Sequence, residues 1–182
     1  MGRLISEDFK RFKEFLNDYN ISEDLLLGEQ LEECKAMHKK LYALMIFSAE
    51  CYVQKMNQIF LEYIDEMISD LLLAIFCWAQ GMYKTSKLEM RCSIENFLKA
   101  TISETDSKIS DEKSVYKVFD KAKIDKHFNK TMSATCLDQF NNDYSLLCHT
   151  VHSDLSQLHS ISALNLLPQY EKQQAHEVQK LI

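Results

Sequence analysis

The sequence predicts an all-α protein, a single-domain bundle of about five to seven helices spanning residues 1–182. Gly and Pro are nearly absent, with three Gly and one Pro in the chain, whereas folds rich in strands need these residues for their turns. Apolar residues also recur along most of the chain at the i, i+3, i+4, i+7 spacing of amphipathic helices. At this length, one domain is the natural expectation.

Interruptions of the helical periodicity divide the first half of the chain. A first helix is expected over about 6–19, with Phe9 and Phe12 on its apolar face. A break at 20–24 precedes a long helix over 28–55, which continues or kinks near Asn57 into a very apolar helix ending at Gln80. We expect Gly81 to stop that helix and to make the turn into the next one, over 83–102.

The second half of the chain is more varied. Residues 103–114 are polar and Ser-rich and predict a loop, followed by a short amphipathic helix near 113–122 and another helix over 131–153. Pro168 is expected to start a C-terminal helix over 168–182, with the core bundle lying within about 28–155. The most apolar run, 71–79, is far shorter than the ~20 residues that span a membrane, so we predict a buried helix and no membrane association.

Charge and composition exclude several functions. The net charge is −6, from 21 Lys and Arg against 27 Asp and Glu, which disfavours broad nucleic-acid binding and predicts no DNA partner. Glycines at positions 2, 28 and 81 cannot form a Gly-rich phosphate loop. Six cysteines without a CxxC motif, together with an N-terminal segment that has no signal-peptide pattern, predict free thiols and a cytoplasmic protein.

The helix over 83–102 carries two charges in an unexpected place. A helical wheel gives a polar arc (Glu89, Ser93, Asn96, Ala100, Ser103) and an apolar arc (Leu88, Met90, Ile94, Phe97, Leu98, Ile102). Arg91 and Glu95 fall inside the apolar arc, and at four residues apart their side chains can meet. Because a charge facing a core is costly unless paired, they form either an ion pair that sets helix register or an arginine held by Glu95 to bind an anion such as phosphate.

The helix over 131–153 carries the second candidate group. Tyr144 belongs to its apolar stripe, and His152 lies at the edge of that stripe near the helix end, a setting that suits an imidazole titrating near pH 7. The histidine is either a hydrogen-bonded structural residue or a catalytic or anion-contacting one. His149 and His152 are three residues apart, unlike HExxH, so we predict no metal site and no cofactor. No strand-to-helix elbow is available to expose a Ser or Cys nucleophile.

These two helices resemble a known family. The segments G-M-Y-K-T-S-K-L-E-M-R-C-S-I-E-N-F-L-K-A (81–100) and Y-S-L-L-C-H-T-V-H-S (144–153) resemble the helical HEPN superfamily (higher eukaryotes and prokaryotes nucleotide-binding), in particular the HEPN-like proteins of abortive-infection and related defence loci. The resemblance implies an all-α bundle, often a homodimer, and metal-independent RNA cleavage in active members.

The resemblance implies a role for each site residue. His152 would act as base or acid on the ribose 2′-hydroxyl or leaving group, and Arg91 would hold the phosphate. Glu95 would fix Arg91, and Tyr144 would donate a hydrogen bond or pack.

Two functions therefore stay open. The first is a HEPN-like ribonuclease or RNA- or nucleotide-binding module in prokaryotic defence or a toxin–antitoxin pair. The second is a non-enzymatic helical interaction or adaptor subunit that acts through protein–protein contacts; a bundle that binds a small ligand is a third and weaker alternative. Catalysis is left open because the family carries His four to six residues after Arg on one helix, whereas Arg91 and His152 can meet only through folding. We expect a homodimer or another protein partner.

Overall fold

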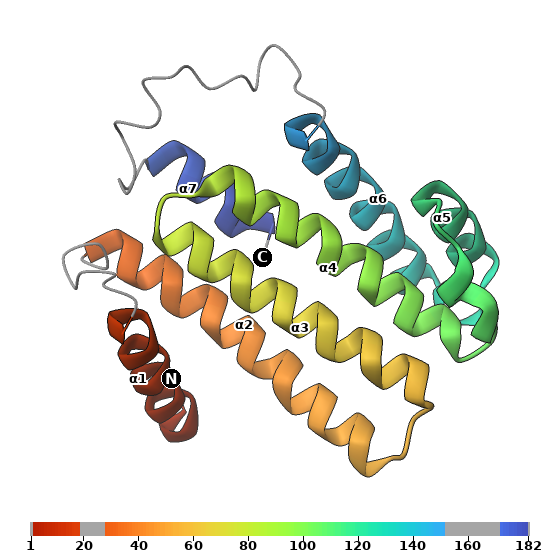
Figure 1. Cartoon of the computed structure of the whole chain (residues 1–182), viewed down its shortest axis with the longest axis horizontal. Coiled ribbons are helices and arrows are strands. Elements are labelled where there is room, and N and C mark those ends of the chain that lie inside the picture. The colour runs from red at the N-terminus through yellow and green to blue at the C-terminus, as the bar shows by residue number, and fades with distance from the viewer. Residues whose placement is uncertain (1, 19–27, 152–171, 182) are drawn as a thin grey trace.

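The structure is a computed structural model that describes residues 2–18, 28–151 and 172–181. These residues contain helices and no strand. The elements in chain order are α1 (Arg3–Asp18), α2 (Gly28–Val53), α3 (Gln58–Ala79), α4 (Tyr83–Ser103), the 3-10 helix η2 (Ser107–Asp111), α5 (Val115–Ile124), the 3-10 helix η3 (Lys126–Phe128), α6 (Thr131–Val151) and α7 (Lys172–Leu181). The prediction of an all-α bundle is confirmed (Figure 1). Pro168 and the predicted start of the last helix lie outside the described residues.

The turns on either side of α3 have clear local causes. After α2 ends, Lys55 adopts the left-handed conformation with φ 54°. The Asn57 side chain then caps α3 by accepting a 2.8 Å hydrogen bond from the backbone N–H of Phe60, as Asn at an N-cap does. The chain therefore breaks here, and the expectation of a continuous or kinked helix is wrong. Gly81 makes the turn between α3 and α4 with φ 72°, as predicted, because glycine adopts this conformation without steric cost.

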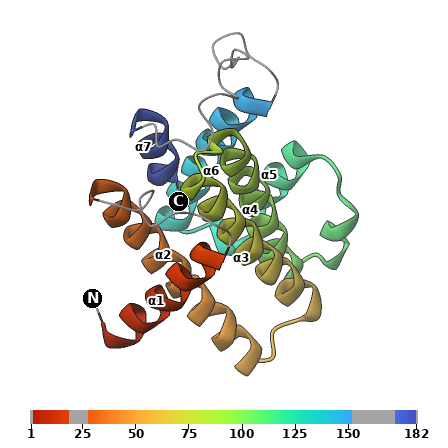
Figure 2. The same cartoon turned by 60° about the vertical axis from the view of Figure 1, so that its left-hand side comes forward.

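Helices α3 and α4 lie side by side and form the centre of the bundle (Figures 1 and 2). Ser86, Ser93 and Ala100, spaced seven residues apart on α4, are all buried. The Ser86 hydroxyl donates a 2.7 Å hydrogen bond across to the Ala74 carbonyl of α3, while that of Ser93 donates to the Met90 carbonyl at 2.7 Å within α4. Part of the polar arc of the sequence likewise contacts α3, since Ala100 lies in a cluster with Ile64 and Met67 of α3 and the Asn96 amide donates to Asp70.

The terminal helices pack onto the same core. Phe9 and Phe12 of α1 lie against the ring of His38 on α2, whose Nε2 is 3.0 Å from the Asp8 carboxylate. The Trp78 indole N–H of α3 donates a 2.9 Å hydrogen bond to the Ala175 carbonyl of α7. The largest apolar cluster of the described chain therefore includes α1 and α7, on either side of the 28–155 range expected to hold the core.

The segment 103–114 differs from the expected loop. It contains η2, and Ile109 at its centre is fully buried in a cluster with Leu98 of α4 and Val118 and Phe119 of α5. One isoleucine in a polar run is enough to dock the segment on the core. Within the described helices, no stretch is sufficiently long and apolar to cross a membrane, and all six cysteines are free thiols.

A buried carboxyl group lies in the contact between α3 and α4. Asp70 is only 8% exposed, and the Asn96 amide donates a hydrogen bond to its Oδ2 at 2.8 Å. The pKa of Asp70 is raised to about 6, chiefly by burial; the Asn96 hydrogen bond opposes the rise, and the charges of Glu66, Glu89 and Glu95 add to it. A carboxyl group whose pKa is higher in the folded state than its ordinary 3.8 favours folding only when protonated.

We expect the Asp70→Asn variant to be more stable than the wild type at pH 7, by about 1–2 kcal/mol. The stability of the wild type falls as pH rises from about 4 through about 6, because the folded chain must then lose a proton that it holds more tightly than the unfolded chain does. The amide removes that dependence. Urea unfolding at several pH values measures both effects.

The matched control is Asp138→Asn, the same change at an exposed position of α6, which should leave the free energy of unfolding and its pH dependence as in the wild type. An Asp70→Asn variant that is less stable at pH 7 and keeps the wild-type pH profile would show that the ionised carboxylate is stabilising.

Candidate functional site

The structure brings together two of the four site residues that the sequence singles out. Arg91 on α4 and Tyr144 on α6 are 53 positions apart, and the Arg91 Nε donates a hydrogen bond to the Tyr144 hydroxyl at 3.0 Å. The guanidinium carbon lies 5.2 Å from the centre of the tyrosine ring, within cation–π range. The hydroxyl group and the ring of Tyr144 together hold the guanidinium in place.

Tyr144 is a rigid support for that arginine. Its side chain is 6% exposed, and its ring contacts Phe119 of α5 edge-to-face at 5.5 Å between centroids. Burial raises the pKa of Tyr144 to about 12, although the hydrogen bond and the charge of Arg91 lower it. The phenol therefore stays protonated at neutral pH and, while accepting from Arg91, retains one proton that it can donate.

Arg91 differs from the other partly covered cations of α4. Lys87 pairs with Glu177 of α7 at 3.3 Å, and Lys99 pairs with Glu95 at 3.0 Å. Arg91 is half-buried, and no carboxylate of the described residues forms an ion pair with it. Its neighbours are the neutral Tyr144 hydroxyl and the Cys148 thiol. A partly desolvated cation without a counter-charge favours an anion as ligand.

The predicted pair of Arg91 with Glu95 is wrong. Glu95 lies four residues from both Arg91 and Lys99, and its carboxylate pairs with Lys99. On a helix, an acid placed four residues before a base is the more favourable order, in agreement with the helix dipole, whereas Arg91 before Glu95 is the reverse order. Glu95 remains close enough that its charge raises the pKa of Tyr144. His152, the remaining site residue, lies outside the described residues.

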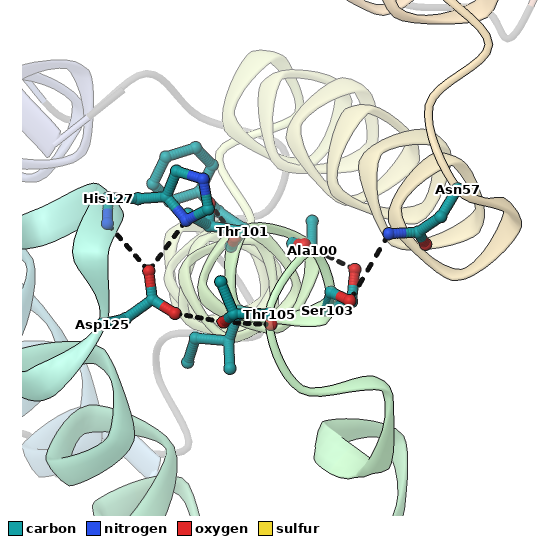
Figure 3. Close-up of polar contacts among 9 residues, drawn as sticks. Asn57, Ala100, Thr101, Ser103, Thr105, Asp125 and His127 are labelled. Carbon is teal, nitrogen blue, oxygen red and sulfur yellow. Dashed lines mark hydrogen bonds and ion pairs between the residues drawn. The ribbon is translucent and has the colours of Figure 1, made fainter.

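A second polar cluster, at the C-terminal end of α4, was not singled out in the sequence (Figure 3). Asp125 is 8% exposed. Its carboxylate accepts hydrogen bonds from the Thr105 hydroxyl and, at 2.8 Å, from the His127 backbone N–H, and it pairs with His127 Nδ1 at 2.7 Å. On the other side of α4, the Asn57 amide donates to the Ser103 carbonyl at 3.4 Å. The only local signal is Asp two residues before His, which is typical of a capped turn.

The acidic and basic side chains that line the hollow beside this cluster balance each other in charge. The hollow has a volume of ≈ 290 Å³ and is lined by Ile102, Thr105, Asp106, Lys121, Ile124, Asp125 and Lys126. Lys121 donates to the Asp106 carboxylate at 2.8 Å, and Asp106 also accepts from the Lys108 backbone N–H. Across the described residues, no group of three or more His, Cys, Asp or Glu side chains could hold a metal ion. The cluster therefore fixes the turn into η3, and Arg91–Tyr144 is the better candidate site.

Comparisons with protein-family models, with curated proteins and with solved structures returned no match.

We expect Asp125→Ala to lower the free energy of unfolding by about 1–3 kcal/mol at pH 7, because it leaves the Thr105 hydroxyl and the N-terminus of η3 without their acceptor. Burial raises the pKa of Asp125, but the hydrogen bonds from Thr105 and His127 outweigh it and lower the pKa overall. The contribution of Asp125 is thus present above the ordinary carboxyl pKa and is lost as pH falls through the lower folded-state pKa.

Denaturant unfolding at pH 7 and at acid pH measures this difference, which should shrink as pH falls. Asp138→Ala, an exposed acid on α6, is the control and should change stability by less than about 0.5 kcal/mol. Equal stability of Asp125→Ala and the wild type at pH 7 would contradict the structural role given to Asp125.

Proposed function

We propose that this chain is a HEPN-like helical module that binds a phosphate group of RNA or of a nucleotide at Arg91. The observation that carries the proposal is the state of the Arg91 guanidinium, which is half-buried, is held by neutral Tyr144 and has no carboxylate partner among the described residues. This is the arrangement that the anion-binding interpretation of the sequence requires, with Tyr144 in the supporting place that was expected of Glu95.

The chemistry of the guanidinium supports a phosphate rather than a generic anion. Tyr144 accepts from Nε and Cys148 is a second hydrogen-bond neighbour of the guanidinium, so the terminal N–H groups that neither partner takes remain to donate to the oxygens of one phosphate. The Tyr144 proton adds a further donor in the same region. Because the net charge of −6 repels a polyanion at long range, the affinity has to come from this local site, which suits a single-stranded RNA end or a nucleotide.

The proposal includes an enzymatic activity, in which the chain cleaves the RNA that it binds. Metal-independent cleavage needs a group that takes the 2′-hydroxyl proton and a cation that stabilises charge on the phosphorane. Arg91 is the proposed cation and His152 the proposed base or acid. A role in prokaryotic defence or as the toxin of a toxin–antitoxin pair belongs to this form.

We expect the wild-type chain to bind a fluorescein-labelled single-stranded RNA or a labelled nucleotide, measured by fluorescence anisotropy. Arg91→Ala should weaken binding by about 10- to 100-fold, the loss expected for charge-assisted hydrogen bonds. Arg91→Lys should recover only part of it, because an ammonium cannot donate in parallel to two oxygens. Tyr144→Phe should cost about three- to ten-fold through the freed Nε.

The control is Arg3→Ala, which removes an arginine of α1 whose side chain is 89% exposed and pairs with Glu7. It changes the net charge by the same amount and should leave affinity unchanged. Circular dichroism checks that each variant is folded. Equal binding by the wild type and Arg91→Ala would rule out a phosphate site at Arg91.

Cleavage is tested separately on labelled RNA in the presence of EDTA, comparing the wild type with His152→Ala. The expected result is loss of cleavage in His152→Ala with RNA binding retained. Equal cleavage by the two chains would remove His152 from the mechanism, and RNA binding without cleavage by the wild type would identify a binding module.

A further inference from the structure

The second half of α2 exposes an unusual number of large apolar side chains. Ile46 is 50% exposed, Phe47 45% and Val53 70%. The inner side of the same helix is fully used, since Ser48 and Tyr52 bond to Asp65 of α3 and Cys51 is buried in the core. A helix that is apolar on both sides normally has a second partner. Helix α1 packs beside the first half of α2, whereas the second half lies at the edge of the bundle with α3 along its inner side (Figure 1).

The exposed side of α2 has a regular pattern. Five exposed residues follow each other at intervals of four, three, four and three positions: Lys39, Ala43, Ile46, Glu50 and Val53. On an α-helix this spacing keeps all five within about 80° of the circumference, and it is the spacing of the contact positions of a coiled coil. We call these five residues the outer face of α2. Among the described residues, neither Lys39 nor Glu50 has an ion-pair partner.

The charges on this face show what it fits. If a second outer face lies antiparallel to the first about a two-fold axis between positions 44 and 45, Lys39 meets Glu50 of the partner subunit, and Glu50 meets the partner's Lys39. Ala43 then meets Ile46 of the partner subunit, a small residue opposite a large one, which allows close packing. Parallel pairing would place like charges opposite each other, which is destabilising.

Val53, the fifth residue of the outer face, and residues that flank this face obey the same symmetry. Ala36 meets Val53 of the partner subunit, and Tyr42, which is partly buried beside His38, meets the partner's Phe47. A surface that is complementary to itself in charge and in size about one axis is what a two-fold dimer requires. A lipid surface or a nucleic acid would not account for charges of both signs at matched positions.

We propose that two copies of this chain associate through antiparallel packing of their α2 outer faces, with two Lys39–Glu50 ion pairs flanking an Ala43–Ile46 centre. This inference is independent of the phosphate site, because Arg91 and Tyr144 lie on α4 and α6 and contribute nothing to the outer face.

Sedimentation equilibrium of the full chain over about 1–100 μM tests the proposal, because dimer stability depends on protomer concentration. We expect the wild type to be a dimer. Lys39→Glu and Glu50→Lys should each raise the dissociation constant at least about ten-fold, because each creates two like-charged pairs across the axis. The double variant Lys39→Glu/Glu50→Lys restores opposite charges and should return to within about three-fold of the wild type. Ile46→Asp should be a monomer.

Lys130→Glu is the matched control, since it makes the same charge reversal at an exposed position outside α2 and should not affect association. Circular dichroism of each variant verifies that the surface changes leave the helices intact. The proposal is overturned if the wild type is monomeric at the highest concentration, even if this face binds another protein. A dimer that the single variants do not weaken, or that the double variant does not restore, overturns it equally.

Discussion

Helices α3 and α4 approach each other through small side chains, and the other elements of the described chain are placed by that pair. Ser86, Ser93 and Ala100 present little bulk toward α3, and the Ser86 hydroxyl bonds directly to its backbone. Helix α4 then contributes to all three apolar clusters, through Met90, Leu98 and Ala100. A larger residue at any of the three small positions would separate the two helices, and every cluster would lose contacts together.

Because α4 lies at the centre of the bundle, its charged side chains are at least partly buried, and their partners indicate whether each has a structural role. From Ser86 to Ser103 no side chain of this helix is fully exposed, so each ionised group needs a partner or a shifted pKa. Lys87 and Lys99 have carboxylate partners, and Asp70 of α3, which faces α4, has a raised pKa. Arg91 differs from both, because its hydrogen-bond partner is the neutral phenol of Tyr144. Such a cation is poorly explained by stability alone, which is why it carries the functional proposal.

The two proposed surfaces belong to different parts of the bundle. The Arg91 site is built between α4 and α6, whereas the outer face belongs to α2, on the other side of α3. Ligand binding can therefore be disrupted without affecting association, and association without affecting ligand binding. Both surfaces consist of side chains on helices rather than of loops, as the scarcity of glycine in the sequence requires.

The sequence by itself determined the all-α class, the turn at Gly81 and the approximate extent of most helices, because periodicity and glycine conformation act over a few neighbouring residues. It also placed Arg91 and Tyr144 on the apolar faces of their helices, which the structure brings together. Only the tertiary structure decided that Glu95 pairs with Lys99, that part of the polar arc of α4 packs on α3, and that Ile109 docks a polar segment. A side chain's partner depends on which helices adjoin it, and residues that are polar yet small enough to be buried do not show in the sequence which side faces water.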